Sequence, residues 1–547
     1  MLQDIYQALT ADETMSGAEP IIIELVFEDP QTPDTVAAGI AAALPNAPVT
    51  VTSAFETPTD QFLFAAFEGI RERGQEAQIF AMARALRTAL DAVEANPVLT
   101  DSTYGAAAVD AATDRESFKG LCTTEKTNLQ PFGWPHKMIR TPQAWRKSRG
   151  EGARVAVIDT GHSTHQELNG AIVQTGQRNL VEGGTDAHDR FNDGMMMNPG
   201  HGTLVCSVVG SRGDVDTRGN VANNGAVVGS APAAEVLPIR AIKSVVNFRQ
   251  STIPAAIAHA INQGADVIAM ALGGPTRVAS TERALRQAVE HGLVIVCAAG
   301  NCWPKVVFPA AYAAEGLCTA VAALTQSKHP WAKSGQGPQV TIAAPGENVW
   351  GASKNKASDP DNGVRASQGT TLATSLTAGV AALWVAHHGG RAALQAKARA
   401  AGTTVQAMFV ASVTHDITKP GVWRGSKTLG AGMIDAEKTL AAPLPGQATG
   451  TEAVAAKNLG KTGVSPTLNT LITHLANHDP DALDDVGPEI ADFAAEILWL
   501  SHRAGAKARA VETLGDEAAV GPDHASADLA AALSDKPHLQ AVLRIAG

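Results

Sequence analysis

Three side chains of the kinds needed for acyl transfer from a peptide follow apolar or glycine-rich segments of this sequence. Asp159 closes the apolar run RVAVID, His201 stands between two glycines, and Asn301 follows VIVCAAG. Acyl transfer requires a nucleophile, a general base, a group that orients the base and donors for the oxyanion. A histidine, an aspartate and an asparagine supply the last three of these roles.

Each of these residues alone also has a plain structural explanation. An aspartate after a strand commonly caps a turn, a single histidine is more often structural, and an asparagine is common in turns. The surroundings of His201 favour the base role, because it precedes an apolar helical run. A helix N-terminus disfavours the protonated imidazole, which keeps the ring able to accept a proton near pH 7.

The nucleophile is expected in the segment SQGTTLATSLTAGVAAL, residues 367–383. Its leucines and valine recur on one face, which predicts a buried helix that begins close to Gly369. Thr371 lies in the first turn of that helix and carries a hydroxyl nucleophile. Its methyl group stiffens χ1 and adds bulk, and a displacement of about 1 Å can lower a rate about a hundredfold.

Taken together, these strings resemble the motifs of the subtilase family of serine peptidases, over about residues 120–441. Their order, Asp then His then the nucleophile, is that of subtilisins and not of chymotrypsins or α/β-hydrolases. Two positions depart from the family pattern, since Thr371 replaces the nucleophilic serine and Ser375 replaces a proline. The matching strings are Asp159-Thr160-Gly161 with His165 and Leu168, His201-Gly202-Thr203, Ala299-Gly300-Asn301 and residues 369–379.

The resemblance implies an Asp159–His201–Thr371 triad, with the Asn301 amide as a donor to the oxyanion, acting on polypeptide substrates. It also implies that Val307 occupies a position often left as glycine at the base of the primary specificity pocket. We therefore expect a shallow pocket that prefers small or short apolar side chains. The residues that the resemblance assigns to substrate binding are Ala271, Leu272, Gly273, Ala299, Gly300 and Val307.

Thr371 leaves three interpretations open. The protein is a slow peptidase with a threonine nucleophile, an ordinary subtilase with a disabling change, or a pseudoprotease that binds peptides or acts as a scaffold. Because Asp159, His201 and Asn301 are all retained, we favour a peptidase over a binding module. Ser375 is not expected to substitute, since it lies one helical turn further along, about 6 Å away.

The elements around these motifs predict an α/β fold with a subtilisin-like, doubly wound parallel sheet. Short apolar runs with few charges are typical of strands buried on both faces, and here they alternate with helical stretches such as 253–263 and 281–291. The predicted strands lie within 154–159, 235–242, 265–272, 292–299, 317–324 and 339–345. We assign residues 121–441 to this catalytic domain.

Residues 1–102 predict a smaller ferredoxin-like α+β domain in the order β-α-β-β-α-β. The strands are expected at 21–27, 49–55, 62–67 and 97–101, and the helices at 35–44 and 72–95. Given the resemblance, this domain is expected to be an inhibitor-I9-like prodomain. It would act as the intramolecular inhibitor of a zymogen that is cleaved within the linker 103–120.

Residues 442–465 predict a second linker, and residues 466–547 an α-helical extension. Helices are expected at 466–476, 488–502 and 527–533, with Trp499 on an apolar face. This extension carries no recognisable chemistry. It is interpreted as a packing module or as a surface for a protein partner.

Composition excludes several other classes of function. The formal net charge of −11 argues against nucleic-acid binding, and no apolar run approaches the roughly 18 residues of a membrane span. The five cysteines are too few for a disulfide framework, and no secretory signal is recognisable, so a cytoplasmic location is expected. Many subtilases bind calcium, and residues 221–232 resemble a shortened calcium loop. An Asn-Gly turn explains them equally well, so we predict no metal and no cofactor.

Overall fold

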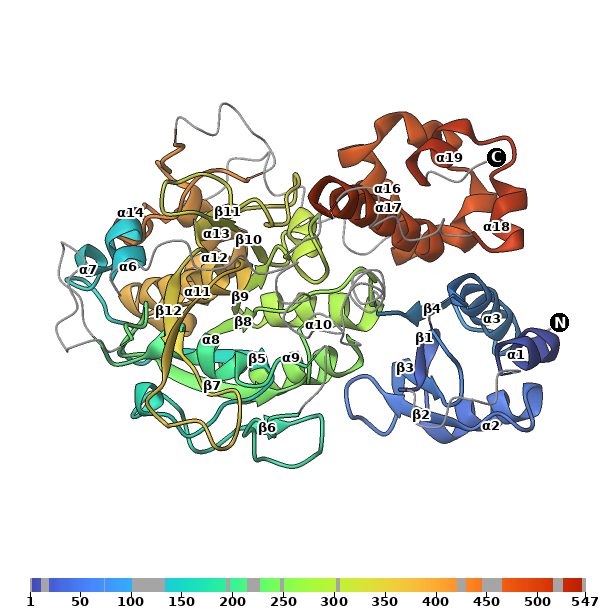
Figure 1. The fold of residues 1–547 in the computed structure, drawn as a ribbon, viewed down its shortest axis with the longest axis horizontal. Coiled ribbons are helices and arrows are strands. Elements are labelled where there is room, and N and C mark those ends of the chain that lie inside the picture. Colours follow the sequence, from blue (N-terminus) through green and yellow to red (C-terminus); the bar gives the residue numbers. More distant parts are fainter. Residues whose placement is uncertain are drawn as a thin grey trace.

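The computed structural model describes three packed parts of the chain (Figure 1). The central part contains a large sheet, the N-terminal part is a small α+β unit, and the C-terminal part is helical. In Figure 1 the N-terminal part (blue) and the C-terminal part (red) lie on the same side of the central part. The described residues are 2–10, 19–72, 74–100, 133–192, 197–213, 227–245, 250–301, 305–420, 429–444, 465–514 and 525–543.

The central sheet has seven strands in the order β11-β10-β9-β8-β5-β7-β6, and every adjacent pair is parallel. After β5, the chain adds β6 and β7 on one side of it and then β8 to β11 on the other side. The strand order therefore reverses beside β5. In open α/β sheets, ligands bind at the carboxyl ends of the strands at such a reversal. The strands are β5 (Arg154–Asp159), β6 (Arg178–Asn179), β7 (Glu235–Arg240), β8 (Val267–Met270), β9 (Val294–Ala298), β10 (Thr319–Leu324) and β11 (Ile342–Pro345).

Helices cover both faces of this sheet, which confirms the doubly wound arrangement. Val155 and Val157 of β5 pack into one hydrophobic core with α8 (His201–Gly210) and α11 (Thr370–His387). Ala156 and Ile158 pack into a second core with α9 (Ile253–Asn262) and α10 (Ala279–Glu290). Successive side chains of a strand point to opposite faces, so a strand buried on both sides has the continuous apolar sequence seen in β5.

Shorter elements complete the central part. The strands β12 (Val349–Ala352) and β13 (Val364–Ser367) form an antiparallel pair that leads into α11. The remaining helices are α6 (Trp134–Ile139), α7 (Thr141–Ala144), α12 (Gly390–Ala401), α13 (Val405–Thr414) and α14 (Ala436–Ala441), with 3-10 turns η1 (Gln166–Leu168), η2 (Gln250–Thr252) and η3 (Ala310–Glu315).

The N-terminal part is a four-stranded antiparallel sheet in the order β2-β3-β1-β4, which confirms the predicted β-α-β-β-α-β arrangement. A further helix, α1 (Leu2–Leu9), packs its Leu9 into the same core and was not predicted. The other elements are β1 (Ile21–Gln31), α2 (Pro33–Ala43), β2 (Val49–Ser53), β3 (Asp60–Phe67), α3 (Glu76–Ala89) and β4 (Glu94–Val98).

The predicted boundary between the second helix and the last strand of this part was wrong. The helix was expected to reach residue 95 and the strand to start at Pro97, but α3 ends at Ala89 and β4 already begins at Glu94. Pairing with β1 from Glu94 to Val98 overrides the helix-forming residues of this stretch. Pro97 is tolerated because β4 is an edge strand, where one backbone N–H is not needed for pairing.

The C-terminal part consists of helices, as predicted, although one of them differs in form. The helix expected at 488–502 is split into a 3-10 turn, η6 (Pro488–Phe493), and a longer helix, α17 (Ala494–Leu514). The other elements are α16 (Pro466–His478), η5 (Pro480–Asp485), α18 (Ala527–Ala532) and α19 (Pro537–Leu543). The linker 103–120 and residues 445–464 of the second linker lie outside the described residues, so the domain boundaries stay predictions.

Candidate active site

Asp159 and His201 meet at the carboxyl edge of the sheet. Asp159 is the last residue of β5, and His201 is the first residue of α8. The imidazole Nδ1 of His201 lies 2.8 Å from Oδ1 of Asp159, whose carboxylate is buried. A carboxylate on Nδ1 favours the tautomer with a proton there, which leaves Nε2 free to accept one.

Thr371 lies on the other edge of the same imidazole. Its Oγ1 is 3.3 Å from Nε2 of His201. Thr371 is the second residue of α11, and the helix starts there because Gly369 provides the turn that precedes it. The 3.3 Å separation is long for a hydroxyl hydrogen bond, as is common for catalytic groups without substrate.

Asn301 is held beside the turn that precedes Thr371. Its Oδ1 accepts hydrogen bonds from the backbone N and the Oγ1 of Thr370, each at 2.8 Å. Its Nδ2 consequently faces Gly369, where an added Cβ would lie only 2.7 Å from that nitrogen. Gly369 also has a φ of 133°, so the glycine is required both for space and for backbone conformation.

Ser375 does not take part in this arrangement, as predicted. Its buried hydroxyl donates a hydrogen bond of 2.8 Å to the backbone carbonyl of Thr371. A helical serine that bonds the carbonyl four residues earlier points along its own helix. The hydroxyl is therefore directed away from the position of a reacting carbonyl.

Sequence reasoning missed two residues that hold the site together. The hydroxyl of Thr160 donates to Oδ2 of Asp189 at 3.0 Å and accepts a hydrogen bond of 3.0 Å from the backbone N of Gly202. The same Asp189 oxygen accepts from the backbone N of Gly200 at 2.7 Å. Thr160 and Asp189 thus join the turn after Asp159 to the start of the helix that carries His201.

A buried arginine supports the same turn from the neighbouring strand. Arg240 is paired in register with Asp159 in the sheet, and its guanidinium donates to the backbone carbonyl of Thr160. The guanidinium also donates to Glu182, with Nε at 2.7 Å from Oε2. Thr160 stood inside a recognised motif, but no signal in the sequence singled out Asp189 or Arg240.

The six residues assigned to substrate binding come together at one place. Ala271, Leu272 and Gly273 follow β8, and Ala299 and Gly300 follow β9. The side chain of Val307 lies between these segments, because a Cβ added to Gly273 or Gly300 would approach its methyl carbons to 2.2 and 3.0 Å. Val307 is fixed there by its backbone N, which donates to the carbonyl of Ala299 at 3.1 Å.

Comparison with known proteins decides the family. The profile described as the Subtilase family matches residues 150–454, more than half of the chain. The chain belongs to the subtilase family. The subtilisin-like fold and the assignment to a family of serine endopeptidases are thereby confirmed, whereas the role of Thr371 stays a prediction.

Several characterised proteins are similar to this subtilase. An intracellular serine protease of Paenibacillus polymyxa is 30% identical over 254 residues, which are 45% of this chain and 71% of that protein. Thermitase of Thermoactinomyces vulgaris is 32% identical over 248 residues, which are 45% of this chain and 79% of that protein. The solved structure of MycP1 with its N-terminal propeptide removed is 25% identical, with a TM-score of 0.43 and coverage of 57% of this chain and 98% of that one.

The N-terminal part of this subtilase contacts the central part through a buried carboxylate. Glu24 of β1 accepts hydrogen bonds of 2.7 Å from the backbone N atoms of Ala279 and Ser280, and one of 2.6 Å from the hydroxyl of Ser280. These groups form the first turn of α10, whose N–H groups have no partner within the helix. Burial raises the pKa of Glu24, and the three donors oppose that shift.

The end of the N-terminal part also reaches the substrate-binding segment. The hydroxyl of Thr276, a few residues after Gly273, lies 3.4 Å from the backbone carbonyl of Leu99. Leu99 is buried and directly follows β4. The chain therefore leaves the N-terminal part beside the segments that would bind a substrate.

The expectation that the protein binds no metal stays a prediction. Among the described residues, no three His, Cys, Asp or Glu side chains are grouped as ligands of one ion. Residues 221–226 of the segment that resembles a calcium loop lie outside the described part of the chain. Within the described part, no helix is both long and apolar enough to cross a bilayer.

Proposed function

We propose that this subtilase is an endopeptidase that uses Thr371 as its nucleophile. The observation that carries the proposal is the continuous contact from Asp159 through His201 to Thr371, at 2.8 and 3.3 Å. His201 removes the proton from Oγ1 of Thr371 while that oxygen attacks the carbonyl carbon of the substrate. Asp159 orients the imidazole and stabilises the imidazolium that forms.

The tetrahedral intermediate carries its charge on the former carbonyl oxygen. Oδ1 of Asn301 already accepts two hydrogen bonds from Thr370, which fixes the orientation of the amide. Its Nδ2 is thereby held where it can donate to the charged oxygen. One such donor is worth roughly 2.7–4 kcal/mol, a magnitude measured on a subtilisin, a member of this family. His201 then gives its proton to the leaving amine, and water hydrolyses the ester formed on Thr371 by the same steps in reverse order.

The methyl group of Thr371 favours a second candidate, a subtilase that binds peptides without cutting them. Thr371 is buried at the start of α11, so its extra methyl group must share the space of the reacting groups. The separation of 3.3 Å from His201 is consistent with that crowding. Retention of the complete Asp159–His201–Asn301 set supports hydrolysis as the first candidate.

The position of Val307 supports a preference for small side chains next to the cleaved bond. Its methyl groups fill the space between Gly273 and Gly300, the two glycines that would flank a substrate side chain. A large aromatic side chain cannot enter this space unless Val307 moves. Alanine and other short apolar residues are therefore the proposed substrates at this position.

The N-terminal part is proposed to be the inhibitory prodomain of a zymogen. The cap that Glu24 provides for α10 and the contact of Leu99 with Thr276 support this role, because they place the end of the domain at the substrate-binding segment. Cleavage is proposed within 103–120. A cytoplasmic location is proposed as well, supported by the similarity to a protein named an intracellular serine protease.

The decisive experiment compares wild type with Thr371→Ser and Thr371→Ala by mass and casein hydrolysis over time. Release of an N-terminal fragment and casein cleavage by wild type, both abolished in Thr371→Ala, would establish Thr371 as the nucleophile. An intact wild type beside an active Thr371→Ser variant would instead support the peptide-binding candidate. If the serine variant is also inert, the defect lies outside residue 371.

A further inference from the structure

The C-terminal helices share one hydrophobic core with the N-terminal domain. Buried residues of α3, such as Phe80 and Leu86, belong to the same cluster as Leu475 of α16 and Trp499 of α17. The rings of Phe80 and Trp499 are 5.7 Å apart between centroids. In Figure 1, α3 of the blue N-terminal domain faces the red helices directly.

Charged side chains cross this shared core with little exposure to water. Arg84 of α3 lies 2.7 Å from Glu496 of α17, whose side chain is only 2% exposed. Arg503 of α17 lies 3.1 Å from Glu76 of α3, with both side chains nearly buried. Glu496 also accepts hydrogen bonds from the backbone N and the hydroxyl of Ser526. Buried ion pairs of this kind require a fixed partner, since an unpaired charge left in a core is strongly destabilising.

A second contact joins all three parts of the chain. Glu94 of β4 accepts hydrogen bonds from Thr467 at the start of α16, at 2.6 Å from its hydroxyl and 3.2 Å from its backbone N. Arg277 of the catalytic domain donates to the same Thr467 hydroxyl at 2.9 Å and lies 3.8 Å from Glu94. The C-terminal helices are thus bonded at one point to both the N-terminal and the catalytic domain.

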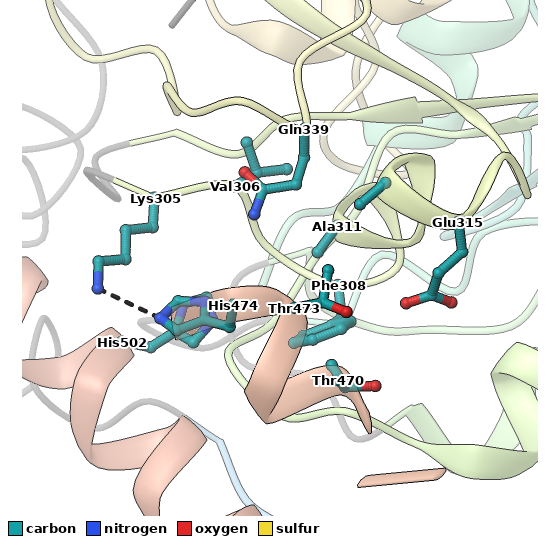
Figure 2. A pocket seen from close by; sticks show the side chains of 11 residues that line it. Lys305, Val306, Phe308, Ala311, Glu315, Gln339, Thr470, Thr473, His474 and His502 are labelled. Carbon is teal, nitrogen blue, oxygen red and sulfur yellow. Dashed lines mark hydrogen bonds between the residues drawn. The ribbon is translucent and has the colours of Figure 1, made fainter. Parts of the chain in front are cut away.

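The helices α16 and α17 also contact the catalytic domain (Figure 2). Lys305 donates to Ser501 at 2.9 Å and lies 3.3 Å from Nε2 of His474. The ring of His502 packs against Phe308, with centroids 5.9 Å apart. Lys305 stands two residues before Val307 and Phe308 directly after it, so this contact secures the C-terminal helices next to the substrate-binding segment.

We propose that the C-terminal helices, within residues 465–514 and 525–543, are a docking surface whose partner is the N-terminal domain of the same chain, within residues 2–10, 19–72 and 74–100. They retain this domain on the catalytic domain after the linker between the two has been cut. The inference rests on the proposed zymogen, because only a cut linker makes retention matter. It goes beyond that proposal by assigning a role to the C-terminal helices.

Retention on two surfaces has a simple physical consequence. If the N-terminal domain were bound only to the catalytic domain, through Glu24 and its neighbours, it would leave when that one interface opens. Because it also contacts the C-terminal helices, both interfaces must open at the same time. Removing one partner of a buried ion pair is destabilising by about 3–5 kcal/mol, and each 1.4 kcal/mol is a factor of about ten. Loss of Arg84 is therefore expected to speed departure of the cut domain by about a hundredfold or more.

The test uses the full chain with Thr371→Ala, so that no self-cleavage interferes. A recognition sequence for a specific protease is inserted in 103–120 and cut, and the bound N-terminal fragment is followed by size-exclusion chromatography and native mass spectrometry. The fragment should stay bound to the unsubstituted protein and leave about a hundredfold faster from Arg84→Ala. Thr467→Val, which keeps the side-chain shape but removes the hydroxyl bonded to Glu94, should speed release by about tenfold.

The matched control is Arg87→Ala. Arg87 lies on the same helix and pairs with Asp492 of the C-terminal part, but this pair is exposed. Exposed pairs contribute about 0–1 kcal/mol, so the rate at which the N-terminal fragment leaves Arg87→Ala should differ less than about fivefold from that of the unsubstituted protein. Immediate loss of the fragment from the unsubstituted protein would overturn the proposal, as would release from Arg84→Ala and Thr467→Val at the control rate. If Arg84→Ala does not fold, the release rate from Thr467→Val decides between the two outcomes. Neither variant tests whether Thr371 hydrolyses peptides, because all measurements use the Thr371→Ala protein.

Discussion

Thr160 and Asp189 form a hydrogen bond of 3.0 Å that links the turn after the triad aspartate to the helix of the triad histidine. The same Asp189 oxygen accepts from the backbone N of Gly200, directly before His201. Asp189 touches none of the reacting atoms, so it acts as a positioning residue. Its charge holds two backbone segments at the distance that the Asp159–His201 contact requires.

Asp189→Asn is expected to lower kcat by about ten- to a hundredfold with little change in KM, because a misplacement of about 1 Å has effects of this size. The kinetics are measured on a peptide substrate in the Thr371→Ser background, together with the melting temperature. Asp186→Asn is the control, since this carboxylate lies in the same loop but is exposed and pairs with His188 and Arg190. An equal loss in both variants, or a rise in KM alone, would contradict the positioning role.

Val307→Gly is expected to open the primary specificity pocket. Removing both methyl groups between Gly273 and Gly300 should raise kcat/KM for phenylalanine relative to alanine by at least about tenfold, since each methylene in a pocket is worth about 1–3 kcal/mol. A peptide library cleaved by the Thr371→Ser protein measures the ratio. Val306→Gly is the control, because Val306 lines the pocket beside the C-terminal helices instead (Figure 2). A wild-type profile dominated by phenylalanine or tyrosine would refute the shallow pocket.

Glu24→Ala is expected to weaken inhibition by the N-terminal domain about ten- to a hundredfold. The change leaves the first-turn N–H groups of α10 without their acceptor, and an unsatisfied buried donor costs about 1–3 kcal/mol. The lag before casein hydrolysis by freshly purified Thr371→Ser protein should shorten accordingly. Glu28→Ala, on the same strand but exposed, should keep the full lag. An unchanged lag in Glu24→Ala would show that the cap does not contribute to inhibition.

Acidification is expected to destabilise the folded chain through His136. Burial lowers the pKa of His136 from 6.5 to about 4, because the enclosed ring is removed from water, and the hydrogen bond to the carbonyl of Val228 opposes this shift only in part. Between these two pH values the unfolded chain binds the extra proton and the folded chain does not. The stabilisation is therefore complete above pH 6.5 and falls by about 3 kcal/mol as the pH approaches 4.

Denaturant unfolding of the Thr371→Ala protein from pH 7 to pH 4.5 measures this effect. His136→Gln should lower the number of protons taken up on unfolding by about one, which flattens the dependence of the free energy of unfolding on pH. Identical slopes in wild type and His136→Gln would contradict the prediction.

The sequence could predict those features that depend on local pattern. The strand that ends at Asp159, the helix that begins at His201 and the order of elements in the N-terminal domain were all recognisable from apolar periodicity and motif residues. The family motifs also identified Thr371 as a neighbour of His201, although 170 residues separate the two.

Features that depend on contacts between distant segments could not be predicted. In the sequence, Arg240 is an ordinary charge at the end of a predicted strand, and Glu24 is an isolated charge in an apolar run. Each becomes meaningful only through a partner far along the chain, Thr160 for Arg240 and Ser280 for Glu24. The end of α3 was misjudged for the same reason, since pairing of β4 with β1 decided it.

The core shared by the first and last parts of the chain affects the order of events during synthesis. Phe80 of α3 emerges early from the ribosome, but Trp499, whose ring packs against it, follows only after the whole catalytic domain has been made. Until then, the face of α3 that carries Phe80 remains exposed to water and to other chains. Because domains generally fold from the N-terminus as they are translated, this face is an apolar surface that stays open to aggregation, and to chaperones, until synthesis is nearly complete.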